Sequence, residues 1–96
     1  MPDLTRKEVI MVLATTERAR LAGVDLAGLN LSGLNFSGAD LIRANLAGCD
    51  LTNAYMRHAE LEEANLEGAI LVNANLKEAY VGTFRDGANL SKVEWY

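Results

Sequence analysis

The sequence predicts an all-β solenoid that is preceded by a short N-terminal capping α-helix. Apolar residues recur at every fifth position through most of the 96-residue chain, and glycine or asparagine recurs two positions after many of them. Near the C-terminus this period breaks. We therefore divide the chain into a capping helix in residues 1–18 and a repeat region in residues 19–96, with the register break at 82–89.

The five-residue period excludes the two simplest regular structures. On an α-helix, five residues rotate by about 140° beyond a full turn, so the apolar column would wind around the helix. On an uninterrupted strand, an odd period would place successive apolar residues on opposite faces. A short extended piece followed by a corner fits the period, and repeated corners of one hand wind the chain into a coil. The thirteen central apolar positions are Leu21, Leu26, Leu31, Phe36, Leu41, Leu46, Leu51, Met56, Leu61, Leu66, Leu71, Leu76 and Val81.

A second apolar column lies two positions before the first, as expected for residues that share one face of an extended piece. From Ala39 to Ala79 it holds only alanine or cysteine. It is larger near the start of the repeats, at Val24, Leu29 and Leu34. We expect this extra bulk to meet the capping helix.

The corner positions carry residues that suit tight turns. Two places after the central residue, the chain has glycine in several repeats and asparagine at Asn53 and Asn73, and both residue types tolerate positive φ. Just before the central residue it often has aspartate or asparagine, whose side chains are expected to point outward and bond to turn backbone. These positions are Asp25, Asn30, Asn35, Asp40, Asn45, Asp50, Asn65 and Asn75.

The repeats resemble those of a known family. The segments ADLIR, ANLAG, CDLTN, AELEE, ANLEG and ANLKE are similar to the A(D/N)LXX signature of the pentapeptide-repeat family, and the resemblance runs from residue 19 to 83. It implies a right-handed quadrilateral β-helix with four pentapeptides per coil. Thirteen repeats would then make a little over three coils.

The N-terminal segment carries a helix start signal. Thr5 and Glu8 have the spacing of a capping box, and Leu4 and Val9 have that of a hydrophobic staple. We predict a helix from about Arg6 to Glu17 that lies over the first coil. The β-branched residues of this segment leave a strand as the alternative. The inward residues of the helix are expected to be Val9, Val12 and Leu13.

The C-terminal segment breaks the period, because Leu90 follows Val81 by nine residues. A loop or bulge at 82–89 is the simplest interpretation. The chain then ends in aromatic residues, which form either a plug over the last coil or a contact patch. A two-fold homodimer through this end is one hypothesis. Its candidate contacts are Phe84, Val93, Trp95 and Tyr96.

Composition limits the partners. Thirteen acidic residues against nine basic ones give a formal net charge of −4, which disfavours direct nucleic-acid binding. The longest apolar run, at residues 9–14, is too short to span a bilayer, so we expect no membrane partner. Cys49 is the only cysteine, which excludes an intrachain disulfide and makes a reducing, cytoplasmic location the natural expectation.

Residues that could carry out chemistry are few. His58 is the only histidine, so a histidine-based metal cluster is excluded, and its corner position indicates a solvated side chain. Cys49 lies in the small inward column, which favours a buried structural role over a nucleophilic one. We therefore expect no catalysis, no cofactor and no metal.

The main candidate for a functional surface is an acidic cluster. With twenty residues per coil, the cluster would share one face with Arg20 and Arg43. A solvated surface of mixed charge is then the alternative to a dedicated site. The residues of the cluster are Asp40, Glu60, Glu62 and Glu63.

These patterns favour a non-enzymatic interaction or structural module with an unidentified protein partner. The resemblance leaves a second function open, because some pentapeptide-repeat proteins imitate the shape and charge of DNA and bind DNA gyrase. A DNA-mimicking regulator of gyrase or another topoisomerase would need an extended acidic surface. A third hypothesis is a scaffold subunit that docks on an enzyme through the end that carries Trp95.

Overall fold

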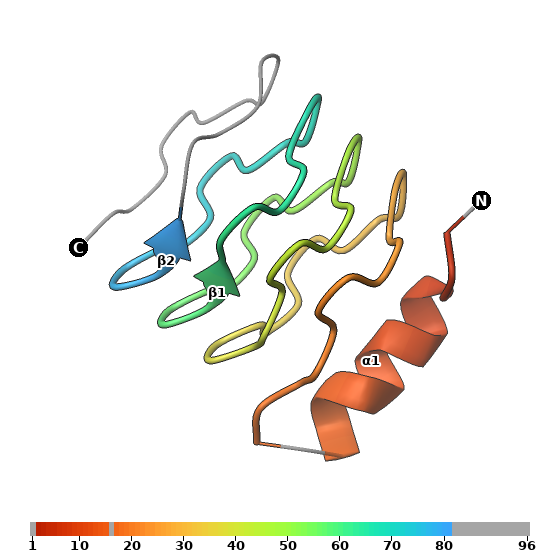
Figure 1. The fold of residues 1–96 in the computed structure, drawn as a ribbon, viewed down its shortest axis with the longest axis horizontal. Helices are drawn as coiled ribbons and strands as arrows, with labels where there is room; N and C mark the ends of the chain where they lie inside the picture. The colour runs from red at the N-terminus through yellow and green to blue at the C-terminus, as the bar shows by residue number, and fades with distance from the viewer. Residues whose placement is uncertain (1, 16, 82–96) are drawn as a thin grey trace.

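The computed structural model of the protein describes residues 2–15 and 17–81. They form one helix followed by a stack of coils, as Figure 1 shows. The helix, α1 (Arg6–Thr15), lies at one end of the stack. Two short strands, β1 (Glu60–Leu61) and β2 (Tyr80–Val81), lie side by side on successive coils. Within the described residues, no helix is long and apolar enough to cross a membrane.

Each coil takes twenty residues. Parallel backbone bridges join residues twenty positions apart, such as Arg20 to Asp40 and Asp40 to Glu60. Strands β1 and β2 continue this column, with Glu60 opposite Tyr80. Four pentapeptides therefore make one coil, which is the number that the family resemblance implies. The bridge columns on the other three sides begin at Asp25, Asn30 and Asn35.

Hydrogen bonds between coils run in both directions along the stack. Leu46 donates its backbone N–H to the carbonyl of Asn65 at 2.8 Å, and Asn65 donates to the carbonyl of Ala44 at 2.9 Å. Most sides of the coil pair through a single bridged residue, and only β1 and β2 are long enough to count as strands among residues 2–15 and 17–81. The predicted β solenoid thus contains little regular sheet, because a corner interrupts every extended piece.

Every corner is a tight turn. At one of them, Ala44 donates its N–H to the carbonyl of Leu41 at 3.0 Å. Positive φ recurs at every fifth residue from Gly23 to Glu78, in the third position of the turn, as a type II turn requires. Glycine and asparagine were expected there, but other residue types also adopt this conformation, which costs a residue with a Cβ about 1 kcal/mol. The additional residues are Arg43, His58, Glu63 and Glu78.

The aspartate and asparagine side chains before the central residues bond to turn backbone, which confirms their predicted role. In each case Oδ1 accepts the backbone N–H two residues later, as Asn45 does from Ala47 at 3.1 Å. These bonds hold the first half of each turn in place. They occur at Asp25, Asn30, Asn35, Asp40, Asn45, Asp50, Asn65 and Asn75.

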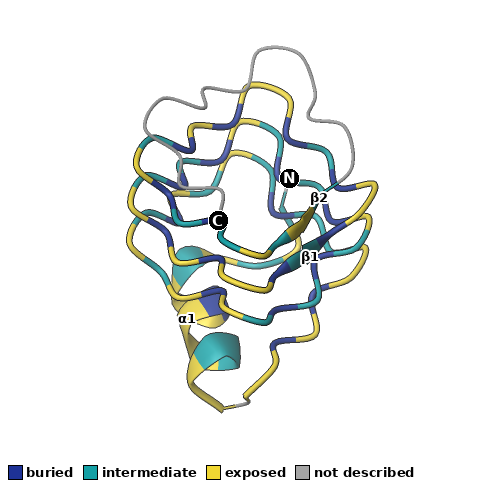
Figure 2. Ribbon diagram, turned by 90° about the vertical axis from the view of Figure 1, so that its left-hand side faces the viewer, coloured by how far each residue is buried: buried dark blue, intermediate teal, exposed yellow. Residues whose placement is uncertain are grey.

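The two apolar columns form the interior of the coil stack. The central residues from Leu21 to Leu76 are at most 3% exposed, and the small column from Ala39 to Ala74 is at most 4% exposed. Figure 2 shows these buried segments alternating with exposed ones around each coil. No polar or charged side chain is buried within the described part of the chain. The interior is therefore a continuous apolar core.

Helix α1 covers the open end of the first coil, as predicted (Figure 1). Thr5 donates its N–H to the carboxylate of Glu8 at 2.9 Å, and Glu8 donates to the hydroxyl of Thr5 at 3.2 Å, which confirms the capping box. Val9 is completely buried. The helix spans Arg6–Thr15, and Glu17 lies outside it, whereas the prediction extended the helix to about Glu17. The Thr15 hydroxyl donates to the carbonyl of Met11 at 3.0 Å and so provides a hydrogen-bond partner for a backbone carbonyl in the last turn.

The larger residues of the second column lie on the first coil, next to α1. Val24, Leu29 and Leu34 are partly buried and pack against the core, as do Val12 and Leu13 of the helix. The bulk of this column therefore decreases from the capped end of the stack towards the middle. This arrangement agrees with the expectation that the extra volume lies beneath the cap.

The segment before α1 pairs with the free edge of the first coil. Asp3 donates its N–H to the carbonyl of Asp25 at 2.6 Å, and its carboxylate accepts the N–H of Asp25 at 2.8 Å. These bonds replace those that an earlier coil would have made. They satisfy backbone groups that would otherwise form an unpaired strand edge.

Candidate functional site

The predicted acidic cluster lies mainly on one side of the coil stack, which we call the charged face. The charged face consists of residues 20–22, 40–42, 60–62 and 80–81. Arg20, Asp40, Glu60 and Tyr80 are stacked in this order on successive coils. Glu62 lies on the same face, and Glu63 occupies the adjoining corner with a φ of 61°. The solenoid thus brings together residues that are twenty positions apart in the sequence.

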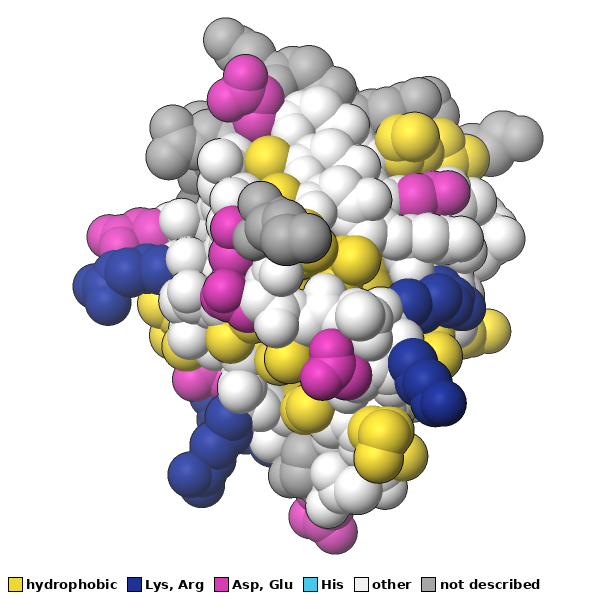
Figure 3. Space-filling view, turned by 90° about the vertical axis from the view of Figure 1, so that its right-hand side faces the viewer, with side chains coloured by type: hydrophobic (Ala, Val, Ile, Leu, Met, Phe, Trp, Pro, Cys, Tyr) yellow, Lys and Arg dark blue, Asp and Glu magenta, His cyan; other side chains and the backbone are white. Residues whose placement is uncertain are grey.

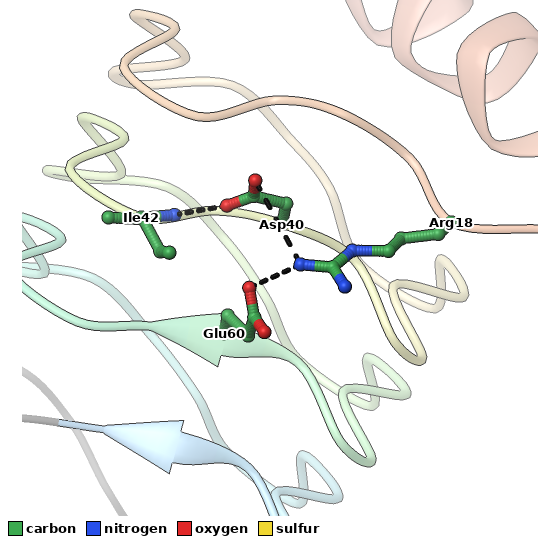
Figure 4. A network of polar contacts seen from close by, with 4 residues as sticks. All are labelled: Arg18, Asp40, Ile42 and Glu60. Atoms are coloured by element: carbon green, nitrogen blue, oxygen red, sulfur yellow. Dashed lines mark hydrogen bonds and ion pairs between the residues drawn. The ribbon is translucent and has the colours of Figure 1, made fainter.

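Arg18 links two of these acidic residues, as Figure 4 shows. Its Nη2 forms an ion pair with Oε2 of Glu60 and lies 4.0 Å from Oδ2 of Asp40. The other carboxylate oxygen of Asp40 accepts the N–H of Ile42 at 3.2 Å, so Asp40 serves both the turn and the ion pair. Because the Arg18 side chain is 54% exposed, the ion pair is expected to contribute at most about 1 kcal/mol.

The corner beside the charged face carries a second ion pair. Arg43 Nε lies 2.6 Å from Oε2 of Glu63, one coil further along the stack. Glu62 is exposed and forms no ion pair within residues 2–15 and 17–81. Three of the four predicted acidic residues are therefore paired with arginine. Arg18 is shared by Asp40 and Glu60, so two arginines face the four carboxylates, and these six residues carry a formal charge of −2.

A similar ion pair occupies another corner of the coil. Arg57 Nη2 lies 3.2 Å from Oε1 of Glu78, and His58 Nδ1 lies 3.6 Å from Oε2 of the same residue. His58 is exposed, as predicted, with a φ of 63°. Figure 3 shows that acidic and basic side chains are also interspersed on the face at the α1 end. Acidic and basic side chains are therefore mixed on the charged face, at the corner of Arg57 and Glu78, and on the face at the α1 end.

Cys49 is completely buried, and its thiol donates to the carbonyl of Leu26 at 2.9 Å. Burial raises the pKa of the Cys49 thiol to about 11, although hydrogen bonds from the backbone of Leu29 and Gly28 oppose this shift. At neutral pH the thiol is therefore almost entirely protonated, which suits a structural role and not a nucleophile. Among the residues that the structure describes, no three acidic, histidine or cysteine side chains gather into a metal site.

Asp50 illustrates how the turns perturb an outer carboxylate. Its Oδ1 accepts the hydroxyl of Thr52 at 2.6 Å and the N–H of Thr52 at 3.0 Å. These two hydrogen bonds lower the pKa of Asp50 below the ordinary value for aspartate, and the bond from the Thr52 hydroxyl has the larger effect. The perturbation thus comes from a structural turn and does not indicate a catalytic acid.

Some predicted site residues lie outside the described part of the chain, and some contacts could not be predicted. Phe84, Val93, Trp95 and Tyr96, and the break at 82–89, fall outside the described residues. The contact of Arg18 with Glu60 was missed, because Arg18 precedes the repeats and shows no periodic signal. For Arg43 and Glu63, by contrast, the twenty-residue coil already predicts that they are stacked.

The fold defines the class of protein: a solenoid whose coils are built from four five-residue units. The family model described as pentapeptide repeats matches eight copies in this chain, over residues 19–57 and 59–80. The chain belongs to the pentapeptide-repeat family. This result confirms the resemblance found in the repeats, and the family implies a right-handed quadrilateral β-helix.

Several solved structures are similar to this chain. The pentapeptide repeat protein Rfr23 from the cyanobacterium Cyanothece 51142 is 32% identical over 81% of this chain, with a TM-score of 0.42. HetL, a pentapeptide repeat protein involved in heterocyst differentiation regulation from Nostoc sp. strain PCC 7120, is 34% identical over 78% of this chain, with a TM-score of 0.35. A pentapeptide repeat protein from the Arabidopsis thaliana thylakoid lumen is 30% identical over 83%, with a TM-score of 0.36.

This chain corresponds to only part of each of these proteins. It spans 56% of the Rfr23 chain, 38% of the HetL chain and 66% of the thylakoid lumen protein. A comparison with curated proteins found no match.

Proposed function

We propose that this protein is a non-enzymatic module that binds a protein partner through the charged face, supported by a right-handed quadrilateral β-helix. The observation that carries the proposal is the division of roles between the two sides of the coil. The described inward columns are apolar, whereas the outer polar side chains are fixed by turns and by contacts between coils. Specific recognition therefore rests on an outer surface that is already ordered before binding, which lowers the entropy cost of association.

The charged face offers two exposed groups next to each other for such recognition. Glu62 is exposed on the turn that follows β1. Tyr80 is 62% exposed and lies directly above Glu60, because these two residues are bridged. Tyrosine is enriched in protein interfaces, and an exposed carboxylate beside it favours a partner that carries a complementary basic side chain.

Absence of catalysis is part of this proposal. It is supported by the buried, protonated state of Cys49 and by the structural cause of the pKa shift at Asp50. The cytoplasmic location and the homodimer through the C-terminal end stay predictions, and no partner other than protein is proposed for the charged face.

The experiment is capture of partners from a native lysate by the immobilised protein, with quantitative mass spectrometry. The variants are Glu62→Lys and Tyr80→Ala on the charged face, and Glu67→Lys is the matched control because Glu67 is exposed on the neighbouring side. We expect one and the same protein to be lost by both charged-face variants and retained by Glu67→Lys. Equal capture by all the variants, or no enrichment over a blank matrix, would contradict the proposal.

A second candidate, a DNA-mimicking regulator of gyrase, is favoured by the net charge of −4 and by the family. The charge density counts against it. A DNA duplex as long as the 29 Å longest extent of the protein carries about 17 phosphate charges. In this chain, moreover, Glu60 and Glu63 are neutralised by arginine. A supercoiling assay discriminates the two functions, because inhibition or protection of gyrase by micromolar protein would favour the mimic.

A further inference from the structure

A hollow of about 380 Å³ lies between two successive coils, away from the charged face. Its lining residues are Asn53, Ala54, Tyr55, Asn73 and Asn75. The volume falls at the lower end of the range of small-molecule sites in proteins. Among residues 2–15 and 17–81, no charged side chain lines it. We propose that this hollow binds a neutral saccharide.

The asparagines of the hollow retain unused hydrogen-bonding groups. Asn73 donates its Nδ2 to Oδ1 of Asn53 at 2.6 Å, and Asn75 uses its Oδ1 to accept the N–H of Lys77 at 3.0 Å. An asparagine amide offers two donor hydrogens and one acceptor oxygen. The Nδ2 of Asn53, the Oδ1 of Asn73 and the Nδ2 of Asn75 therefore have no protein partner among the described residues. Alternating donors and acceptors of this kind match the hydroxyl groups of a sugar.

Tyr55 supplies an apolar surface beside these amides. Tyr55 is 56% exposed. Its column neighbours Asn35 and Asn75 both form the turn-stabilising bond to backbone. A tyrosine at this position does not form that hydrogen bond, which contributes about 1 kcal/mol. It exposes an aromatic ring instead. Turn geometry explains Asn53 and Asn73, whose φ values are both 61°, but it does not explain Tyr55.

The combination of groups selects the chemical class of the ligand. An aromatic ring packs against the C–H face of a pyranose ring, while amides bind its hydroxyl groups. The described lining contains no lysine or arginine, which disfavours phosphate and carboxylate ligands, and no aspartate or glutamate, which disfavours cations. A neutral, hydroxyl-rich ring satisfies both the polar and the apolar components.

The backbone holds the hollow in a fixed shape. Tyr55 donates its N–H to the carbonyl of Leu34 at 2.9 Å, and Asn75 donates to that of Ala54 at 2.9 Å. Ala54 is 1% exposed and anchors this stretch in the core. The backbone of the lining residues therefore does not need to be ordered by the ligand. Because the hollow is shallow and open, we expect binding in the millimolar range.

The experiment is a titration of the full ¹⁵N-labelled chain with glucose, galactose, mannose and N-acetylglucosamine, followed by two-dimensional NMR. Each sugar is added to about 50 mM, which is sufficient to detect a millimolar Kd. We expect saturable shifts of the side-chain amides of Asn53 and Asn75 for at least one sugar. Absence of shifts with all four sugars would overturn the proposal.

Three variants assign the binding to Tyr55. Tyr55→Ala should weaken binding at least tenfold, whereas Tyr55→Phe should retain it because the ring is preserved. Tyr80→Ala is the matched control for sugar binding alone, because Tyr80 is similarly exposed but does not line the hollow. Unchanged affinity in Tyr55→Ala would contradict the site. Shifts with N-acetyl-alanine-methylamide, a peptide-backbone probe, in the absence of shifts with sugars would contradict the ligand class.

Discussion

Arg6 of α1 donates from Nη1 to the carbonyl of Asn30 in the first coil, at 2.8 Å. Both terminal nitrogens of the same guanidinium also reach the carbonyl of Ser32, at 3.3 Å. One side chain thus satisfies two carbonyls at the capped end of the stack. The capping helix is held by this polar contact as well as by burial of Val9.

Arg6→Ala should destabilise the protein by about 1–3 kcal/mol, because a charged donor is lost and two carbonyls lose a partner. Lys7→Ala is the matched control, since Lys7 is exposed on the same helix and gains the same helix propensity. Denaturant titration followed by circular dichroism measures both. Equal stability of the two variants would show that the contact contributes nothing.

Leu51→Ala should destabilise the protein by about 2–5 kcal/mol, because Leu51 is completely buried in the central column and its loss opens a cavity. Ser37→Ala is the control at an exposed position of the preceding coil, and it should change the free energy of unfolding by less than about 0.5 kcal/mol. Chemical denaturation measures both variants. Similar losses from the two would contradict the inward assignment of the leucine column.

The acid–base behaviour of Asp50 should depend on Thr52. The pKa of Asp50 is lowered in the folded protein, so its carboxylate stabilises the fold above the ordinary pKa of aspartate. This stabilisation is lost as the pH falls through the folded value. Thr52→Ala should raise the pKa of Asp50, whereas Thr52→Ser should leave it lowered because the hydroxyl is kept. Titration of the Asp50 carboxyl carbon by NMR measures the shift, and an identical titration curve in Thr52→Ala would contradict this cause.

Cys49 should resist thiol reagents in the folded state. Its pKa of about 11 leaves about one thiol in a thousand ionised at pH 8, compared with about one in four for an unperturbed cysteine. Folded protein should therefore react with Ellman's reagent at least a hundredfold more slowly than protein in denaturant. An exposed cysteine, placed by Ser37→Cys in a Cys49→Ala background, is the control for the folded state. Equally fast reaction of native Cys49 would show that it is accessible.

Most of the coil could be predicted from the sequence, because its determinants are local and periodic. The central leucines, the aspartate and asparagine residues of the turns, and the capping box of Thr5 and Glu8 each need information from only a few neighbouring residues. The positive φ at Arg43 and Glu63 is different. The period locates these corners, but the residue types do not, because neither prefers the left-handed region.

The contacts of the cap could not be predicted, because they depend on how α1 is placed on the first coil. The sequence shows Arg6 only as the first residue of a helix, and its carbonyl partners lie more than twenty positions away. Arg18 likewise reaches Glu60 across two coils. The surface contacts of the repeats follow from the period once the coil length is known, as for Asn53 and Asn73.

The central claim is that the chain turns at every fifth residue and stacks residues twenty positions apart. The most direct measurement is NMR detection of scalar couplings across the hydrogen bonds between coils, starting with the N–H of Leu46 and the carbonyl carbon of Asn65, whose donor and acceptor lie 2.8 Å apart. We predict a coupling for this pair and for the pair that joins Leu41 to Glu60. Couplings between residues four apart in residues 40–75, as in a helix, or rapid solvent exchange of these amides, would contradict the account.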